Sequence, residues 1–201
     1  GKIVAGTAHV LNHGMEHWHP NPDFFFLPGG GPMLDLGPYY VTNLIQLIGP
    51  VKRVGALATA SFAERLVTAE GPKKGQTVPV KTPTNIHALL EFVNGATVTL
   101  STSWDIWAHR HANMELYGTE GSLFLDDPWH CQEPVIELRK GDTVERIEVE
   151  AANPYRLELE DLNAAIRGER PPLLGRADAL GQVRTIDALF RSAAGGQTVK
   201  L

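Results

Sequence analysis

The chain has 201 residues, of which 43% are hydrophobic and 20% are charged, as in an ordinary globular protein. Its 23 acidic and 18 basic residues give a net charge of −5, which argues against nucleic acid or an anionic membrane as a partner. The single cysteine, Cys131, excludes an internal disulfide and indicates a reducing, cytoplasmic location. No stretch approaches the roughly 18 apolar residues that span a bilayer.

The chain begins with Gly1-Lys2-Ile3-Val4-Ala5-Gly6, and its first methionine is Met15. This start has neither an initiator methionine nor the basic and apolar segments of a signal peptide. A trimmed tag or a lost methionine is one explanation. The one we favour is that the chain is part of a longer protein, within which residues 1–201 form one domain.

The first 50 residues predict a strand, a long loop and a helix. The segment Ile3–Val10 has the apolar, β-branched character of a strand. The segment His17–Gly31 is rich in Pro, Gly and aromatic residues, and a long loop of this kind is more often functional than idle. The segment Met33–Ile48 has helical apolar spacing, with Pro38 either kinking the helix or lying in its first turn.

From Val51 onward, apolar and polar residues alternate as in strands. The segment Val51–Phe62 predicts a strand, and residues 64–76 are expected to form an exposed loop. Three hairpins are predicted next: Asn85–Val93 with Ala96–Trp104 around an Asn94-Gly95 type I′ turn, His111–Tyr117 with Ser122–Leu125, and Val135–Arg139 with Thr143–Val149.

The last 50 residues predict two helices, Tyr155–Arg167 and Arg176–Ala194, separated by Pro171-Pro172. The apolar face of the first helix consists of Leu159, Leu162, Ala165 and Ile166. A helix, a run of strands and two more helices predict an α+β fold, with an open-faced, predominantly antiparallel sheet and helices on one face. The other face is either wet or paired with a second copy of the chain.

Asp35 and Tyr39 form the pair that most suggests catalysis. They lie four residues apart, so a continuous helix places both on one face, just after the flexible Gly29-Gly30-Gly31 turn. A neighbouring positive charge would favour the Tyr39 phenolate and make it a proton acceptor, while Asp35 orients a substrate hydroxyl. The alternative is structural: Tyr39 packs on the sheet and Asp35 only starts the helix.

Closely spaced histidines form two groups: His9, His13, His17 and His19, and His109 with His111. Such imidazoles can bind zinc or iron, but Gly14 interrupts any helix that would align the first group. We favour histidines that bind a hydroxylated ligand in a polar cleft, and no metal site. The aromatic residues either stack on a sugar or pack in the core: Trp18, Trp104, Trp107 and Phe24-Phe25-Phe26.

Four motifs follow one another along the chain: Gly29-Gly30-Gly31-Pro32-Met33-Leu34-Asp35-Leu36-Gly37-Pro38-Tyr39, then Gly49-Pro50-Val51 with Val54, then Tyr117-Gly118-Thr119-Glu120-Gly121-Ser122-Leu123, and finally Asp161-Leu162 with Ala165-Ile166 and Gly168. Together they resemble the C-terminal domain of the glucose–fructose oxidoreductase / inositol dehydrogenase / rhizopine-catabolism (Gfo/Idh/MocA) family, over about residues 5–195. The resemblance implies an open-faced sheet like that of the C-terminal domain of glyceraldehyde-3-phosphate dehydrogenase.

The resemblance also implies a function, that of the substrate-binding and oligomerisation half of an oxidoreductase acting on a sugar, cyclitol or related polyol. Family members bind NAD or NADP in an N-terminal Rossmann domain, which also carries a catalytic lysine. This chain has no Gly-x-Gly-x-x-Gly motif between a strand and a helix, so we expect no cofactor-binding residues in it and no turnover by the isolated chain.

The family's paired acid and proton-transfer residues correspond to Asp35 and Tyr39. Many members have histidine at the second position, so either Tyr39 or the lysine is the base. The residues expected to contact the substrate are His17, Trp18, His19, Arg110 and His111. The sheet is expected to join copies of the chain into a dimer or tetramer. Two alternatives are a non-catalytic module that associates through its sheet and a His-ligated metal-binding β protein.

Overall fold

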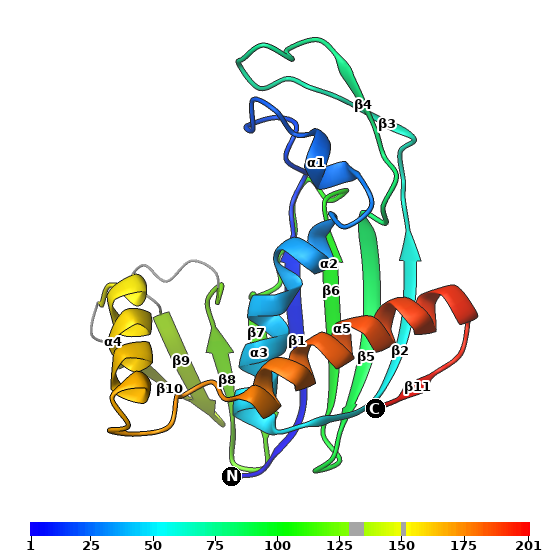
Figure 1. The fold of residues 1–201 in the computed structure, drawn as a ribbon. Helices are drawn as coiled ribbons and strands as arrows, with labels where there is room; N and C mark the ends of the chain where they lie inside the picture. The colour runs from blue at the N-terminus through cyan, green and yellow to red at the C-terminus, as the bar shows by residue number, and fades with distance from the viewer. Residues whose placement is uncertain (129–134, 150–151) are drawn as a thin grey trace.

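The structure is a computed structural model that describes residues 1–128, 135–149 and 152–201, so Cys131 lies outside the described residues. The strands are β1 (Ile3–Leu11), β2 (Val51–Thr59), β3 (Glu64–Leu66), β4 (Thr77–Pro79), β5 (Asn85–Phe92), β6 (Thr97–Ser103), β7 (Met114–Gly118), β8 (Gly121–Leu125), β9 (Val135–Lys140), β10 (Thr143–Glu148) and β11 (Val199–Lys200). The helices are α1 (Asp23–Phe26), α2 (Pro32–Asp35), α3 (Gly37–Ile48), α4 (Pro154–Ile166) and α5 (Arg176–Gly195) (Figure 1).

The main sheet has nine strands in the order β10-β9-β8-β7-β1-β6-β5-β2-β11. Its neighbouring strands are antiparallel except for β1 and β6, which run parallel at its centre. The connection between these two strands passes through α2, α3, β2 and β5 before the chain returns as β6. The predicted α+β fold with an open-faced, predominantly antiparallel sheet is confirmed.

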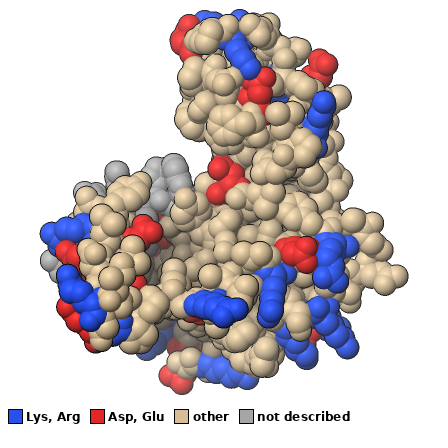
Figure 2. Space-filling view, in the orientation of Figure 1, with Lys and Arg blue, Asp and Glu red and all other residues tan. Residues whose placement is uncertain are grey.

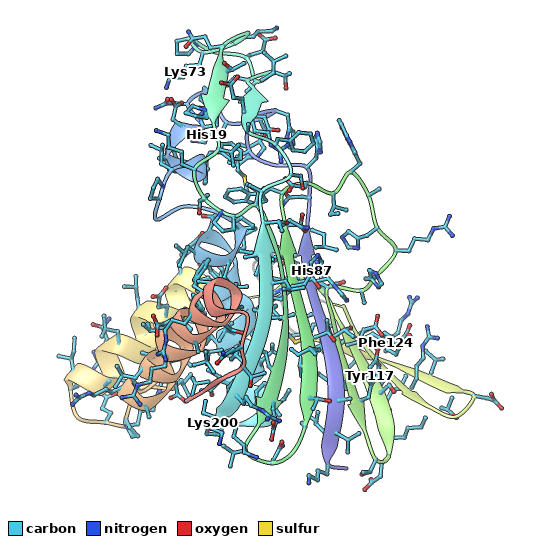
Figure 3. The ribbon with its side chains drawn as sticks, turned by 90° about the vertical axis from the view of Figure 1, so that its right-hand side faces the viewer. His19, Lys73, His87, Tyr117, Phe124 and Lys200 are labelled. Carbon is cyan, nitrogen blue, oxygen red and sulfur yellow. The ribbon has the colours of Figure 1, made fainter. Side chains whose placement is uncertain are left out.

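The two faces of the sheet differ because side chains alternate along each strand. In β5, Ile86, Leu90 and Phe92 are buried on the face that α3 and α5 cover (Figure 1), whereas His87 and Leu89 point to the other face and are exposed. Figure 3 shows the labelled side chains of His87, Tyr117 and Phe124 on the side of the sheet away from the helices. This second face is left open by the described residues.

The hairpin of β5 and β6 forms where predicted, but its turn is of a different type. The N–H of Gly95 donates to the carbonyl of Phe92 (3.0 Å) and that of Phe92 to Ala96 (2.9 Å). The central residues of the turn are therefore Val93 and Asn94, and Gly95 follows them with a φ of +90°. This is the three-residue loop in which a glycine forms a bulge after the turn, not a type I′ turn.

A small lobe stands at one end of the sheet and is made by residues 12–31 and 60–84, including α1, β3 and β4 (Figure 1). The expectation of an exposed loop over 64–76 is wrong for its first part, since Arg65, Val67 and Ala69 are buried there. The lobe has its own apolar core, built from Met15, Phe26, Val67, Ala69, Val78 and Trp104.

The two C-terminal helices form as predicted, but α4 does not bury the face expected of it. Leu159, Leu162 and Ile166 are exposed, and Ala164 is the buried residue of this helix. In contrast, α5 packs on α3 and β2 through Ile186, Ala188 and Leu189. In the described ranges, no helix combines the length and apolarity needed to cross a lipid bilayer.

Candidate functional site

A cavity of about 1050 Å³ lies where the lobe meets the sheet. Figure 2 shows the outline of the molecule hollowed beneath the lobe, on the side of α4. The lining comes from five parts of the chain: the end of β1 with the loop that follows, α1, the junction of α2 and α3, the loop between β6 and β7, and the segment after β8. Its walls combine aromatic, imidazole, amide and carboxylate groups, as a pocket for a small polar molecule requires.

Asp35 and Tyr39 both line this cavity. The single helix predicted over 33–48 is broken, because α2 ends at Asp35 and α3 begins at Gly37, with Leu36 between them. Pro38 lies in the first turn of α3, where the missing N–H costs little. Asp35 thus ends one helix and Tyr39 lies in the first turn of the next, yet both reach the same space.

The glycine turn before α2 is shaped by close contacts with other residues of the lobe. Gly31 has a φ of +95°, and a Cβ added there would lie 2.9 Å from the carbonyl oxygen of Pro83. A Cβ on Gly30 would lie 2.4 Å from the carbonyl oxygen of Phe25. Because glycine alone fits these positions, the turn can pack closely on Phe25 and Pro83 and bring Asp35 to the cavity.

The two carboxylates of the site have different surroundings. Burial raises the pKa of the half-buried Asp35 carboxyl above its ordinary value. The Asp127 carboxylate accepts a hydrogen bond of 2.9 Å from the hydroxyl of Tyr40, which in turn accepts one of 3.2 Å from Nδ2 of Asn113. Burial and the nearby Asp127 raise the pKa of Tyr40, so its phenol stays protonated and acts as a donor.

Two pairs of stacked rings join the loops around the cavity. The ring of His13 stacks on the indole of Trp107, with centroids 3.3 Å apart, and both residues line the cavity. The ring of His9 stacks on that of His111 at 4.3 Å. Burial, followed by the charges of His111 and His109, lowers the pKa of His9.

The structure brings only part of the predicted substrate-contact set to the cavity. His17 and Trp18 line it. His19 lies in the lobe (Figure 3), where its Nδ1 accepts a hydrogen bond from the N–H of Asn21 and its ring meets the edges of neighbouring aromatic rings. Arg110 is exposed and is not part of the lining, and His111 is occupied by its stack on His9.

Several groups of the site gave no local signal in the sequence. Asn12, Asn113 and Asp127 line the cavity, but no motif connects them with Asp35 or Tyr39. The hydrogen bond between Tyr40 and Asp127 joins residues 87 positions apart. Only a correct arrangement of α3 beside β7 and β8 would have revealed it.

The aromatic residues named from the sequence divide between core and cavity except for Phe24, which is exposed and outside the lining. Trp104 and Phe26 are fully buried in the core of the lobe. Trp18, Trp107 and Phe25 line the cavity, where a sugar ring could stack. Across residues 1–128, 135–149 and 152–201, no three His, Cys, Asp or Glu side chains are grouped so that they could hold a metal ion.

A model of the GFO/IDH/MocA C-terminal domain matches residues 1–124. The chain belongs to the Gfo/Idh/MocA family. This confirms the resemblance inferred from the four sequence motifs. The match ends at the last residues of β8, so it includes the site residues Asp35 and Tyr39 and the loop from Trp107 to Asn113.

Two members of the family are related to the chain over most of its length. It is 25% identical to D-xylose 1-dehydrogenase (NADP(+)) 2 of Haloferax volcanii, over 100% of the chain and 57% of that protein. It is 30% identical to the uncharacterized oxidoreductase ORF334 of Rhizobium meliloti, over 84% of the chain and 48% of that protein. The chain therefore spans about half of the length of these two relatives.

Solved structures of the Gfo/Idh/MocA family share its fold. An aldose-aldose oxidoreductase from Caulobacter crescentus, complexed with glycerol, superimposes with a TM-score of 0.74 at 23% identity, over 100% of this chain and 56% of that one. Levoglucosan dehydrogenase gives a TM-score of 0.75 at 21% identity, over 100% of this chain and 60% of that one. The open sheet with helices on one face is thus the fold of this family's C-terminal half.

Proposed function

We propose that this chain is the substrate-binding half of an NAD(P)-dependent oxidoreductase that acts on a hydroxyl or carbonyl group of a sugar, cyclitol or related polyol. The observation that supports it most is that Asp35 and Tyr39, the family's paired acid and proton-transfer positions, line one cavity. The names of two relatives point the same way, since one is a D-xylose dehydrogenase and another a levoglucosan dehydrogenase. Residues 1–201 form the domain that holds the sugar.

In this proposal, the chain binds a hydroxyl group of the substrate and accepts or donates its proton. The carboxyl of Asp35 accepts a hydrogen bond from the substrate hydroxyl and fixes its direction toward Tyr39. Tyr39 lines the cavity and the residue is 45% exposed, so a molecule bound there can contact it. A positive charge beside Tyr39, such as the oxidised nicotinamide ring of a bound cofactor, would favour its phenolate and allow it to accept the proton.

The rest of the cavity provides binding groups suited to a sugar. The faces of Trp18 and Trp107 can stack on the apolar face of a sugar ring. The imidazoles of His13 and His17, the amide nitrogen of Asn12 and the amide oxygen of Asn113 offer donors and acceptors to hydroxyl groups. His17 and Trp18 therefore remain proposed substrate contacts, and the structure offers no comparable position for Arg110.

The nicotinamide cofactor does not fit a site made by this chain alone. In the described residues, the Gly29-Gly30-Gly31 turn leads into α2, which has only four residues and cannot serve as the helix of a dinucleotide-binding unit. A part of the protein outside this chain would hold the cofactor, which supplies a hydride acceptor or donor when bound. The isolated chain is therefore not expected to turn over.

The open face of the sheet supports self-association of the intact protein. Leu57 and Leu89 come from neighbouring strands of this face and are 72% and 65% exposed. Large exposed aliphatic side chains on a flat sheet match the interface of a homo-oligomer. Leu89→Lys should lower the molar mass in sedimentation, whereas Leu173→Lys, at an exposed leucine between α4 and α5, should not.

The test of the proposed function uses the intact protein encoded by the reading frame that contains this chain. It is mixed with NAD or NADP and with D-xylose, other aldoses, anhydrosugars and inositols, and the reduced nicotinamide is followed by absorbance. We expect oxidation of at least one of these polyols and a rise in melting temperature with the same compound. If no compound is oxidised and none raises the melting temperature, the proposal is wrong.

A further inference from the structure

Arg65 is a buried arginine in the lobe, and its guanidinium group connects two loops that line the cavity. Only 5% of its surface is exposed. Its Nη1 donates to Oε1 of Glu16 at 2.9 Å, and its Nη2 donates to the carbonyl oxygen of Trp104 at 2.9 Å and to the carboxylate of Asp105. The guanidinium group also lies over the ring of Phe62, with Cζ 4.4 Å from its centroid.

The two acidic partners belong to different walls of the cavity. Glu16 lies in the histidine loop, residues 12–18, where its neighbours Met15 and His17 line the cavity. Asp105 begins the tryptophan loop, residues 105–109, where Trp107 lines it. Arg65 is not part of the lining and lies behind both loops.

Other bonds bring these two loops together at the cavity. The N–H of Ile106, in the tryptophan loop, donates to the carbonyl oxygen of Asn12 at 3.0 Å. The rings of His13 and Trp107 then stack with centroids 3.3 Å apart. The relative position of the loops therefore sets the distance between two side chains that face the proposed substrate.

The charges around Arg65 indicate a geometric role more than a gain in stability. One guanidinium faces the carboxylates of Glu16 and Asp105 beside an apolar core, and Oε2 of Glu16 and Nε of Arg65 have no partner among the described residues. A buried ion pair adds little net stability compared with apolar packing, but its planar, forked geometry fixes the groups that it joins. Thr84 completes the arrangement, since its hydroxyl donates to Oδ2 of Asp105 at 2.9 Å.

We infer that Arg65 is a positioning residue, which acts through Glu16 and Asp105 to hold the histidine loop and the tryptophan loop at the spacing that the cavity needs. The expected effect of Arg65 on substrate binding rests on the proposed function, in which this cavity takes a sugar or polyol. The expected effect of Arg65 on the position of the two loops is independent of that function, because it concerns only the stack of His13 on Trp107.

The first measurement follows the His13 ring by NMR of histidine-labelled chain, with His13→Gln used to assign its signal. In the unmodified chain the stacked indole of Trp107 shifts this signal upfield. Arg65→Met keeps an unbranched, largely apolar side chain that is two atoms shorter, and it removes the bonds from Arg65 to Glu16, Trp104 and Asp105. We therefore expect the two loops to shift relative to one another and the upfield shift to be lost. Leu189→Ala, at a fully buried residue of α5, is the control for a general loss of stability and should retain the shift.

The second measurement gives kcat/KM of the intact protein with the sugar that it oxidises. Arg65→Met should lower kcat/KM by about 100-fold, the loss expected when a binding group is displaced by about 1 Å. Arg65→Lys should recover only part of this loss, because an ammonium group cannot bridge two carboxylates in the same planar geometry. Leu189→Ala should have little effect on kcat/KM at a temperature where it is folded.

An unchanged His13 signal in Arg65→Met would overturn the inference, as would an unchanged kcat/KM. If Arg65→Met does not fold, Glu16→Gln takes its place, since it weakens the hold on the histidine loop and leaves the bond between Arg65 and Asp105. A loss of the His13 shift in a protein that oxidises no sugar would refute the proposed function and leave the role of Arg65 in the loops intact.

Discussion

The hydroxyl of Tyr40 donates a 2.9 Å hydrogen bond to Asp127, while the next residue toward the N-terminus, Tyr39, lines the cavity. Two adjacent tyrosines in the first turns of α3 thus have different surroundings. Tyr40 is fully buried and joins α3 to the segment after β8, whereas Tyr39 is half exposed. Their Tyr→Phe variants should separate a structural effect from a catalytic one.

Tyr40→Phe should lower the free energy of unfolding by about 1–3 kcal/mol, because Asp127 and Asn113 both lose a hydrogen-bond partner in a partly buried place. Urea denaturation measures this loss. Tyr39→Phe removes a hydroxyl at the cavity surface and should leave the free energy of unfolding within about 0.5 kcal/mol of the unmodified value. Equal unfolding midpoints for the unmodified chain and Tyr40→Phe would contradict a stabilising role for the Tyr40 hydroxyl.

Gly95→Ala should destabilise the chain by about 1–2 kcal/mol, since alanine there must adopt a φ of +90°. An added Cβ would meet no atom within 4 Å, so the effect isolates the strain of the backbone in the hairpin turn. Gly195→Ala is the matched control: it also meets no atom within 4 Å, but it lies at the end of α5 and should stabilise by up to about 1 kcal/mol. The same sign for both variants in thermal unfolding would refute this account.

The buried imidazole of His9 should make the chain less stable in mild acid. Burial and the nearby His111 and His109 lower its pKa from 6.5, with His87 lowering it further and Glu115 opposing the shift. The unfolded chain thus binds a proton at His9 more readily than the folded one. The stability gained from neutral His9 is present above pH 6.5 and is lost as the pH falls through the lowered pKa.

His9→Gln should therefore reduce the fall in melting temperature as the pH is lowered from about 6.5. Leu173→Gln, at the exposed leucine between α4 and α5, controls for the introduction of an amide without loss of an imidazole. If His9→Gln and the unmodified chain lose stability in parallel over this range, His9 does not cause the acid sensitivity.

The sequence predicted the sheet well because its signals there are local. The pattern over Asn85–Val93 and Ala96–Trp104 predicted two paired strands, and β5 and β6 form and pair there. The order of the strands was harder to predict, because the parallel pairing of β1 with β6 joins residues 92 positions apart, such as Ala5 and Thr97. No local pattern encodes such a pairing.

The lobe was missed because its side chains reverse the usual preference for burial. In β3 the charged Arg65 points inward and Leu66 points outward, so the alternation reads as polar and exposed. The inward position of Arg65 depends on Glu16 and Asp105, which lie 49 and 40 residues away in the chain. Burial of the cation is thus decided by tertiary partners.

The sequence singled out Asp35 and Tyr39, the two central residues of the candidate site, but not most of the other residues that line the cavity. The glycine turn and the spacing of four residues singled out Asp35 and Tyr39, although the helix expected to carry both is broken at Leu36. The helical spacing of Leu159, Leu162 and Ile166 predicted a buried face of α4. In the part of the chain that the structure describes, nothing covers these side chains and they are exposed.

The most direct test of the central claim is kcat of the intact protein for its sugar, measured for Tyr39→Phe beside Tyr155→Phe. Tyr155 is an exposed tyrosine on α4 and lies outside the cavity lining, so its variant controls for the loss of a phenol hydroxyl. If Tyr39 moves the proton, Tyr39→Phe lowers kcat by about 100-fold or more and changes KM little, while Tyr155→Phe leaves both values as they were. A Tyr39→Phe protein with the kcat of the unmodified enzyme would contradict the claim.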